Sequence, residues 1–264
     1  MAQMFLSPKD VSQQLADIGI KKAQAPIYEL FFFGILAGMY IAFGAQAALT
    51  VLSGGTMDPG FAKFLAGSVF SVGLMLVLIP GAELFTGNIL MTIGLIDSRF
   101  STWKLLRNWL VVYIGNFVGS LILAYIVFGS GLLGNSAVGL TPIGIIAQKT
   151  AVMKVSLSFT EAFARGILCN MLVCLAVIMS LFSRSMTGKI FGIYFPVMVF
   201  VLCGYEHSIA NMYFLPLGFM VNGAFAQNFW NIWHNLVPAT LGNIVGGILI
   251  VVFHPKTQKK LFNP

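Results

Sequence analysis

The sequence predicts an all-α polytopic membrane protein with six transmembrane helices, arranged as two inverted three-helix repeats. Three observations lead to this prediction: the composition, the lengths of the apolar stretches, and an internal repeat in their order. The second helix of each repeat is expected to be broken inside the membrane.

Composition points to lipid as the main solvent of this chain. Its 264 residues are 58% hydrophobic and 9% charged, with a mean hydropathy of +0.90. A soluble domain carries roughly 25% charged residues, so this chain has too few to cover a water-facing surface. Residues 1–26 are polar and mixed in charge, unlike a cleavable signal peptide, so we expect the first span to direct its own insertion.

The N-terminal segment, residues 1–26, is expected to form a short amphipathic helix on the cytoplasmic face. Ser7 is placed to cap this helix, Pro8 suits its first position, and Asp10 can reach back to the cap. Apolar residues then recur at helical spacing, as in helices that lie in a membrane interface. Such a helix either anchors the chain or acts as a movable plug.

Six apolar stretches bounded by charges or turn residues follow the N-terminal segment. They are residues 27–52, 61–96, 105–133, 159–182, 188–220 and 236–253. The second and fifth would be about 50 Å long as straight helices, whereas the hydrocarbon core is about 30 Å thick. Each is also too short for two crossings, so we expect one crossing with an internal break.

Lysine and arginine predict the orientation, because cytoplasmic loops carry an excess of both. With both termini in the cytoplasm, eleven of these residues lie inside and only Lys63, Lys149 and Lys154 lie clearly outside. The chain then reads as one transmembrane domain, 1–264, in the cell membrane. Its parts are the N-terminal helix (1–26), the first repeat (27–133), the second repeat (159–253) and a cytoplasmic tail (254–264).

Three short motifs occur in the same order in both halves of the chain. The pairs are 34–39 with 166–171, 81–88 with 204–211, and 115–119 with 242–246. An odd number of spans per repeat makes the second half enter the membrane from the opposite side. Overlong, interrupted helices at matching positions of inverted repeats indicate a transport site.

Local residues supply the means of breaking the second and fifth spans. Pro80 precedes the first break, and Pro196 with Gly204 surrounds the second. Free backbone groups at such a break are tolerated only where protein or a water-filled path satisfies them. The alternative is a pair of kinks that serve packing alone.

Two carboxylates lie at equivalent positions of the breaks. Glu83 and Glu206 are costly at membrane depth unless they are paired or solvated. We interpret both first as structural groups that accept hydrogen bonds from free backbone N–H groups of the break. A direct role with substrate or protons is the alternative, although a carboxylate in a pore would repel an anion.

His207 is the candidate central residue, because its counterpart in the first repeat is the apolar Leu84. Imidazole can hydrogen-bond an anion or pass it a proton near neutral pH. Thr86, Asn170 and Asn211 are candidates to orient that anion. Apolar constrictions are expected from four residues, each of which could equally be plain core: Phe70, Leu74, Leu84 and Phe200.

The remaining chemistry-bearing residues exclude several classes of protein. Cys169, Cys174 and Cys203 have no metal-ligand spacing, and we interpret them as small packing residues. We expect no metal and no cofactor. The net charge of +7 is scattered through loops and follows from topology, so no nucleic acid partner is expected.

Three of these strings together resemble the formate/nitrite transporter family. They are residues 81–87 (GAELFTG), 166–176 (GILCNMLVCLA) and 204–211 (GYEHSIAN). Three motifs in order on six spans are specific, and the similarity runs from the N-terminal helix through the sixth span. Glu83 stands where some members of the family have Asp, which keeps the carboxylate.

The resemblance implies a homopentamer of aquaporin-like protomers, each with its own pore. It implies passage of formate first, or of nitrite, hydrosulfide or related small anions, with proton coupling under some conditions. His207 would be the central imidazole, with Thr86, Asn170 and Asn211 as its polar neighbours. Phe70, Leu74 and Phe200 would form constrictions, and Lys154 would draw anions into the outer vestibule.

Two alternatives from other classes stay open at this point. One is a neutral pore for water or glycerol, although the paired Asn-Pro-Ala motifs of such pores are missing. The other is a membrane-embedded enzyme that uses Glu206 and His207 as acid and base. The physiological anion, the direction of flux, channel or carrier behaviour, and gating by the N-terminal helix are left open by the sequence.

Overall fold

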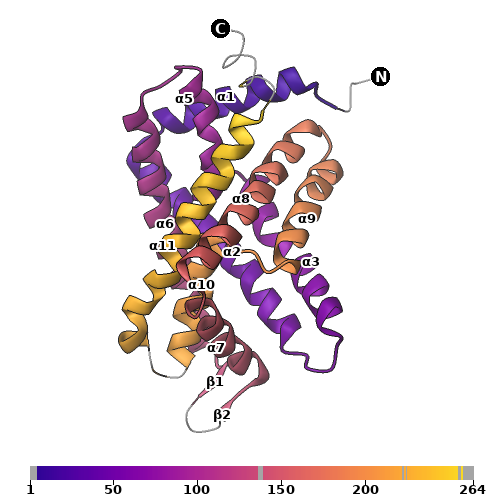
Figure 1. The fold of residues 1–264 in the computed structure, drawn as a ribbon, viewed down its shortest axis with the longest axis vertical. Helices are drawn as coiled ribbons and strands as arrows, with labels where there is room; N and C mark the ends of the chain where they lie inside the picture. Colours follow the sequence, from indigo (N-terminus) through magenta and orange to yellow (C-terminus); the bar gives the residue numbers. More distant parts are fainter. Residues whose placement is uncertain (1–4, 136–138, 222, 224, 255–256, 258–264) are drawn as a thin grey trace.

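The protein is almost entirely helical (Figure 1). The computed structural model describes residues 5–135, 139–221, 223, 225–254 and 257. In chain order the elements are α1 (Pro8–Gln24), α2 (Ile27–Leu52), α3 (Pro59–Leu78), α4 (Phe85–Asn88), the 3₁₀ turn η1 (Ile89–Met91), α5 (Thr92–Ile96), α6 (Thr102–Gly129), β1 (Gly134–Asn135), β2 (Gly139–Leu140), α7 (Pro142–Val155), α8 (Phe159–Phe182), α9 (Met186–Leu202), α10 (Ser208–Val221) and α11 (Phe225–Val252).

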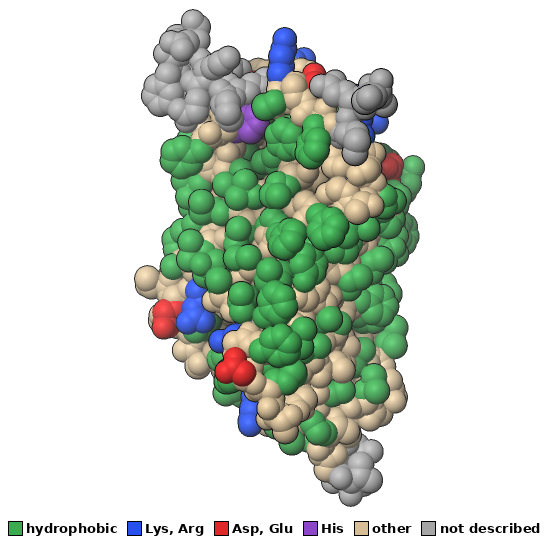
Figure 2. All heavy atoms as spheres, turned by 90° about the vertical axis from the view of Figure 1, so that its right-hand side faces the viewer, with side chains coloured by type: hydrophobic (Ala, Val, Ile, Leu, Met, Phe, Trp, Pro, Cys, Tyr) green, Lys and Arg blue, Asp and Glu red, His purple; other side chains and the backbone are tan. Residues whose placement is uncertain are grey.

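Five of the described helices, α2, α3, α6, α8 and α11, are long and apolar enough to cross a membrane. Their outward faces carry large exposed hydrophobic side chains such as Phe32, Leu110, Ile126 and Leu168. Figure 2 shows hydrophobic side chains over the middle of one face, with charged side chains gathered toward its two ends. The protein is therefore an integral membrane protein.

The ends of the helices mostly agree with the sequence prediction. Helices α2 and α8 match the predicted spans, and α1 begins with the predicted capping box of Ser7 and Asp10. Helix α11 begins at Phe225 rather than at 236, because the intervening residues are polar enough to fail a hydropathy test yet still helical. Helix α7 lies in a stretch to which no element was assigned. Most of the predicted tail, 254–264, lies outside the described residues.

The molecule has two distinct ends. At the top of Figure 1 lie α1, α5 and the end of α11, and we call this end the α1 side. At the bottom lie α7 and the β1–β2 hairpin, and we call this end the hairpin side. The segment just before α1 is held to the end of α8, because Leu6 N donates to the Phe182 carbonyl at 2.9 Å.

Glycines bring the helices of each repeat into backbone contact. Helix α2 packs on α6, and α8 packs on α11. A Cβ atom on Gly115 would lie 2.7 Å from the Phe31 carbonyl oxygen, and one on Gly166 would lie 2.7 Å from the Ala239 carbonyl oxygen. Small residues are what allow such close helix contacts in membranes. The glycine motifs of the internal repeat therefore form equivalent helix pairs.

The predicted breaks in the second and fifth spans are confirmed. Helix α3 ends before Gly81, which has φ of 91°, and α9 ends before Gly204, which has φ of 70°. Beyond each glycine, a backbone N–H returns to the helix: Ala82 to the Val77 carbonyl at 2.8 Å, and Tyr205 to the Phe200 carbonyl at 3.0 Å. This is the glycine-dependent Schellman cap that ends many helices.

Pro196 does not contribute to the second break, contrary to the prediction. It lies inside α9, which continues to Leu202. Proline removes one backbone hydrogen bond, but neighbouring helices in a membrane protein can satisfy the freed groups. The left-handed conformation of Gly204 is what ends the helix.

Candidate functional site

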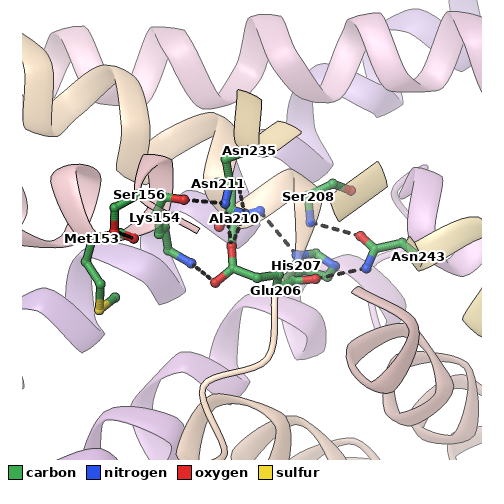
Figure 3. Close-up of polar contacts among 10 residues, drawn as sticks. All are labelled: Met153, Lys154, Ser156, Glu206, His207, Ser208, Ala210, Asn211, Asn235 and Asn243. Carbon is green, nitrogen blue, oxygen red and sulfur yellow. Dashed lines mark hydrogen bonds and ion pairs between the residues drawn. The ribbon is translucent and has the colours of Figure 1, made fainter. Parts of the chain in front are cut away.

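His207 lies at the centre of the molecule, where the two broken helices meet. It is the last residue before α10, it is only 3% exposed, and its Nε2 atom is 2.9 Å from Oγ1 of Thr86 on α4. The Nδ1 atom of His207 accepts a hydrogen bond from Ala210 N at 3.2 Å (Figure 3). Because an accepting nitrogen carries no proton, the proton of the neutral ring lies on Nε2 and is donated to Thr86. The hydroxyl proton of Thr86 is then free for another acceptor.

Aromatic rings cover the imidazole of His207. The Phe200 ring stacks on it with centroids 5.8 Å apart, and Phe70 meets Phe200 edge to face at 5.6 Å. Phe70 comes from α3 and Phe200 from α9, so both broken segments contribute. The structure thus places one predicted constriction residue, Phe200, against the predicted central residue and a second, Phe70, against Phe200.

Asn170 on α8 holds the backbone of Thr86. Its Nδ2 atom donates to the Thr86 carbonyl at 3.2 Å and to the Asn243 carbonyl at 2.7 Å. Its Oδ1 atom is buried and has no hydrogen-bond partner among the described residues. Asn170 therefore positions Thr86 and leaves one acceptor unused.

Glu206 forms the centre of a buried polar network next to His207 (Figure 3). It pairs with Lys154 Nζ at 2.8 Å and accepts from Asn211 at 2.7 Å and Asn235 at 3.0 Å. Asn235 also donates to the Lys154 carbonyl at 2.9 Å. Lys154, placed by the family resemblance in an outer vestibule, is only 7% exposed and lies over the Phe214 ring.

The first repeat builds the same network around Glu83. Lys22 Nζ is 2.7 Å from Glu83 and 2.8 Å from the Asn88 side-chain oxygen. Asn88 in turn donates to Glu83 at 2.7 Å and to Asn108 at 2.9 Å. Asn108 donates to the Lys22 carbonyl at 3.3 Å, as Asn235 does to that of Lys154.

The prediction of which groups donate hydrogen bonds to the two carboxylates was wrong. In the part of the chain that the structure describes, the donors to Glu83 and Glu206 are side chains, not backbone N–H groups of the break. The backbone N–H groups of these residues donate instead to the carbonyls of Phe33 and Arg165. The pairing neutralises each charge, which is why a carboxylate is tolerated at this depth.

Asn116 and Asn243 brace the two breaks in the same way. Asn116 donates to the carbonyls of Gly34 and Glu83, each at 2.8 Å, and accepts from Phe85 N at 2.9 Å. Asn243 donates to the carbonyls of Gly166 and Glu206 at 2.8 and 2.9 Å and accepts from Ser208 N at 2.9 Å. These asparagines satisfy backbone groups that the breaks leave open.

Four residues of the networks were not among the candidates from sequence: Lys22, Asn88, Asn108 and Asn235. The repeat carried a usable signal for all four. Asn88 is the counterpart of Asn211, Asn108 precedes Gly115 by the spacing at which Asn235 precedes Gly242, and Lys22 precedes Gly34 as Lys154 precedes Gly166. Extending the repeat alignment beyond its motifs would have found them.

A cavity of 270 Å³ lies on the α1 side of the Glu83 network. Leu74 and Leu84, both predicted constriction residues, line it together with Lys22, Glu83 and Asn88. Most of its other walls are apolar side chains of α1, α3, α8 and α9. The cavity therefore combines charged groups near its break with a hydrophobic surround.

Comparisons with known proteins agree with the motifs. The family described as Formate/nitrite transporter matches residues 9–255. The chain is 42% identical to the "Probable formate transporter" of Methanothermobacter thermautotrophicus, over 95% of this chain and 96% of that protein. It is 36% identical to the "Formate channel FocA" of Escherichia coli (strain K12), over 94% of this chain and 92% of that protein.

Two solved structures share the fold. One, described as "Pentameric formate channel with formate bound", superposes with a TM-score of 0.74 at 38% identity, over 88% of this chain and 95% of that chain. The other, described as "FNT family ion channel", superposes with a TM-score of 0.81 at 30% identity, over 95% and 98% of the two chains.

Proposed function

Because the chain belongs to the formate/nitrite transporter family, we propose that it is a pore for small monovalent anions, with formate as the first substrate. Nitrite and hydrosulfide are the alternatives within the family. Membership of a transporter family also excludes the enzyme alternative, in which Glu206 and His207 act as acid and base on a substrate.

The contact between Thr86 and His207 is the observation that carries this proposal. Since Nε2–H of the imidazole is donated to Thr86, the threonine hydroxyl can donate its own proton to an anion at the centre of the protein. Doubly protonating His207 would cost the hydrogen bond that Nδ1 accepts from Ala210. We therefore assign His207 to polarising the Thr86 donor rather than to releasing a proton.

Dehydration is the main barrier for an anion in such a path, because transfer of a charge to apolar surroundings is expensive. Phe70 and Phe200 beside His207, and Leu74 and Leu84 at the cavity, are our proposed constrictions. The Thr86 hydroxyl lowers the barrier between them. A proton that enters with the anion from solution lowers it further, which gives flux that rises at acidic pH.

The lysines, carboxylates and asparagines of the two networks have a shared role in this proposal. Each Lys–Glu pair holds a broken helix and keeps a cation near the path, without the net negative charge of a free carboxylate. Lys154 and Asn211 act at the second break, and Lys22 and Asn88 act at the first. Asn170 orients Thr86.

We propose that the chain is one domain that crosses the cell membrane six times, with both termini in the cytoplasm. Helices α9 and α10 together make the fifth crossing, and α3 with α4, η1 and α5 makes the second. The equivalent contacts of Asn116 and Asn243 support two inverted repeats and an aquaporin-like protomer. A homopentamer is proposed because the similar solved channel is described as pentameric.

The decisive experiment is flux through purified protein in liposomes. Formate, nitrite, hydrosulfide and glycerol are compared at acidic and neutral external pH, with His207→Phe and Thr86→Val beside the unmodified protein. We expect selective anion flux that is faster at acidic pH. Both variants should lower formate flux at least tenfold, because the central donor is lost.

Thr86→Ser is the matched control, since it keeps the hydroxyl and should keep most of the flux. Size-exclusion chromatography checks that each variant is still assembled. Glycerol flux without anion flux would establish the neutral-pore alternative. Unchanged formate flux in His207→Phe would refute the role of the imidazole.

A further inference from the structure

Lys189 is a charged residue of the α1-side cavity that the repeated networks do not explain. It lies in the first turns of α9 and lines the 270 Å³ cavity together with Lys22, Glu83 and Asn88. It is half-buried rather than fully exposed. The cavity thus has two lysines, from α1 and from α9.

The charges of the cavity do not cancel. Lys22 is paired with Glu83 at 2.7 Å. The structure describes all eight Asp and Glu residues of the chain, and none of their side chains forms an ion pair with Lys189. Among the residues that the structure describes, the cavity therefore carries one uncompensated positive charge, which matches one monovalent anion.

The repeat does not require this lysine. The spacing that relates Glu83 to Glu206 relates Ala66 to Lys189, and Ala66 is buried in α3. At the aligned position the hairpin side therefore has no lysine. The lysine of α3, Lys63, lies three residues earlier and is exposed, whereas Lys154 is the counterpart of Lys22 at the aligned position. A residue that only supported the shared scaffold would be expected in both halves.

The position of Lys189 also carries a local cost. It is the fourth residue of α9, near the positive end of the helix dipole, where an acidic side chain would be favoured. A basic residue that only sets the membrane orientation could lie equally well in the preceding turn, where Arg184 is exposed. Lys189 and the helix terminus together make the cavity wall more positive than either alone.

We propose that Lys189 is the anion-capturing residue of this cavity, which is a loading subsite for a small monocarboxylate on the α1 side of the pore. The carboxylate of the anion binds Lys189, and its apolar part lies against the hydrophobic walls. Capture concentrates the anion before it meets Leu74 and Leu84. The inference rests on the proposed function and adds a subsite and an asymmetry to it.

Single-channel current in planar bilayers tests this subsite, with formate as the carried anion. At low ionic strength, Lys189→Gln should lower the current of formate entering from the α1 side about 10-fold, the lower end of the range by which charged clefts raise the local concentration of counter-ions. Current entering from the hairpin side should change less than twofold. Added salt of large impermeant ions should abolish the difference, since screening shortens to about 3 Å at 1 M.

Two variants control for folding and for general surface charge. Lys189→Arg keeps the charge and should keep the current. Lys21→Gln removes an exposed lysine from the same side of the molecule, outside the cavity lining, and should have little effect. Equal losses in both directions, or an equal loss in Lys21→Gln, would overturn the subsite. The subsite would also be overturned if the unmodified protein conducts formate and Lys189→Gln conducts it equally well. If the unmodified protein does not conduct formate, the proposed function itself is refuted.

Discussion

The two Lys–Glu networks have the same design but different surroundings. In the Lys154–Glu206 pair the side chains are 9% and 2% exposed, whereas in the Lys22–Glu83 pair they are 21% and 14% exposed. Lys154 belongs to α7, which packs on α10, while Lys22 belongs to the peripheral helix α1. The same motif is thus fully buried at one break and closed by a surface helix at the other. The comparison shows that the repeat places corresponding residues around both carboxylates, whereas the packing of each half determines how deeply they are buried.

The largest effect is expected from a substitution that breaks the buried network. Glu206→Gln leaves Lys154 as an uncompensated buried cation and should cost about 3–5 kcal/mol of stability. Glu83→Gln should cost about 1–2 kcal/mol, because water can reach Lys22. The midpoint of thermal unfolding in detergent measures both changes.

The double variant Lys154→Met with Glu206→Met is the control for this comparison. It removes both charges, so it should recover most of the stability that Glu206→Gln loses. Equal destabilisation by Glu206→Gln and Glu83→Gln would show that burial does not distinguish the two networks.

A smaller and symmetric effect is expected from the asparagines that brace the breaks. Asn116→Ala and Asn243→Ala each remove three hydrogen bonds to backbone groups and should each cost about 2 kcal/mol. Both asparagines are completely buried, so the two losses should agree within about 0.5 kcal/mol. Thermal unfolding of the two variants side by side measures this, and a clear inequality would place the asymmetry in the scaffold as well.

The smallest effect concerns α1, the element that closes the more exposed network. Hydrogen bonding to the Ser7 side chain lowers the pKa of Asp10 below its usual value. The ionised carboxylate therefore stabilises the start of α1 above the ordinary pKa of Asp, about 4, and this contribution disappears as the pH falls through the lowered pKa. The protection of the first-turn amides against hydrogen exchange, measured relative to an unstructured peptide at the same pH, should fall below about pH 4.

Asp10→Asn is the control for this pH dependence. The variant should show low protection of the first-turn amides at neutral pH already, with little further change of protection on acidification. The same pH dependence in Asp10→Asn as in the unmodified protein would show that another group is responsible.

Much of the architecture could be predicted from the sequence because its causes are local. Apolar stretch lengths located α2 and α8, and the capping residues located α1. The excess length of the second and fifth stretches, with Pro80 and Gly204, located the breaks. The prediction was wrong where local composition misleads. Polar residues hid the first turns of α11, and Pro196 was read as a break although α9 runs through it.

The sequence predicted which residues belong to the candidate site better than it predicted the contacts between them. His207 and Thr86 were both candidates, but they are 121 positions apart in the sequence. No local pattern indicates that Nε2 of His207 and Oγ1 of Thr86 are in contact. Lys22 is 61 positions from Glu83 and looked like a topology signal. Such pairs depend on how the two halves pack, which hydropathy does not report.

The sequence by itself determined the membrane location, the two repeats and the places where the helices break. These features follow from hydrophobic length and from backbone preferences of single residues, which act before any tertiary contact forms. Only the tertiary structure decided which cations neutralise the two glutamates, which nitrogen of the central imidazole carries the proton, and that Lys189 lies in a cavity with no ion-pair partner among the described residues. Those features depend on side chains from distant segments being placed within hydrogen-bonding distance, and packing of the whole bundle sets that distance.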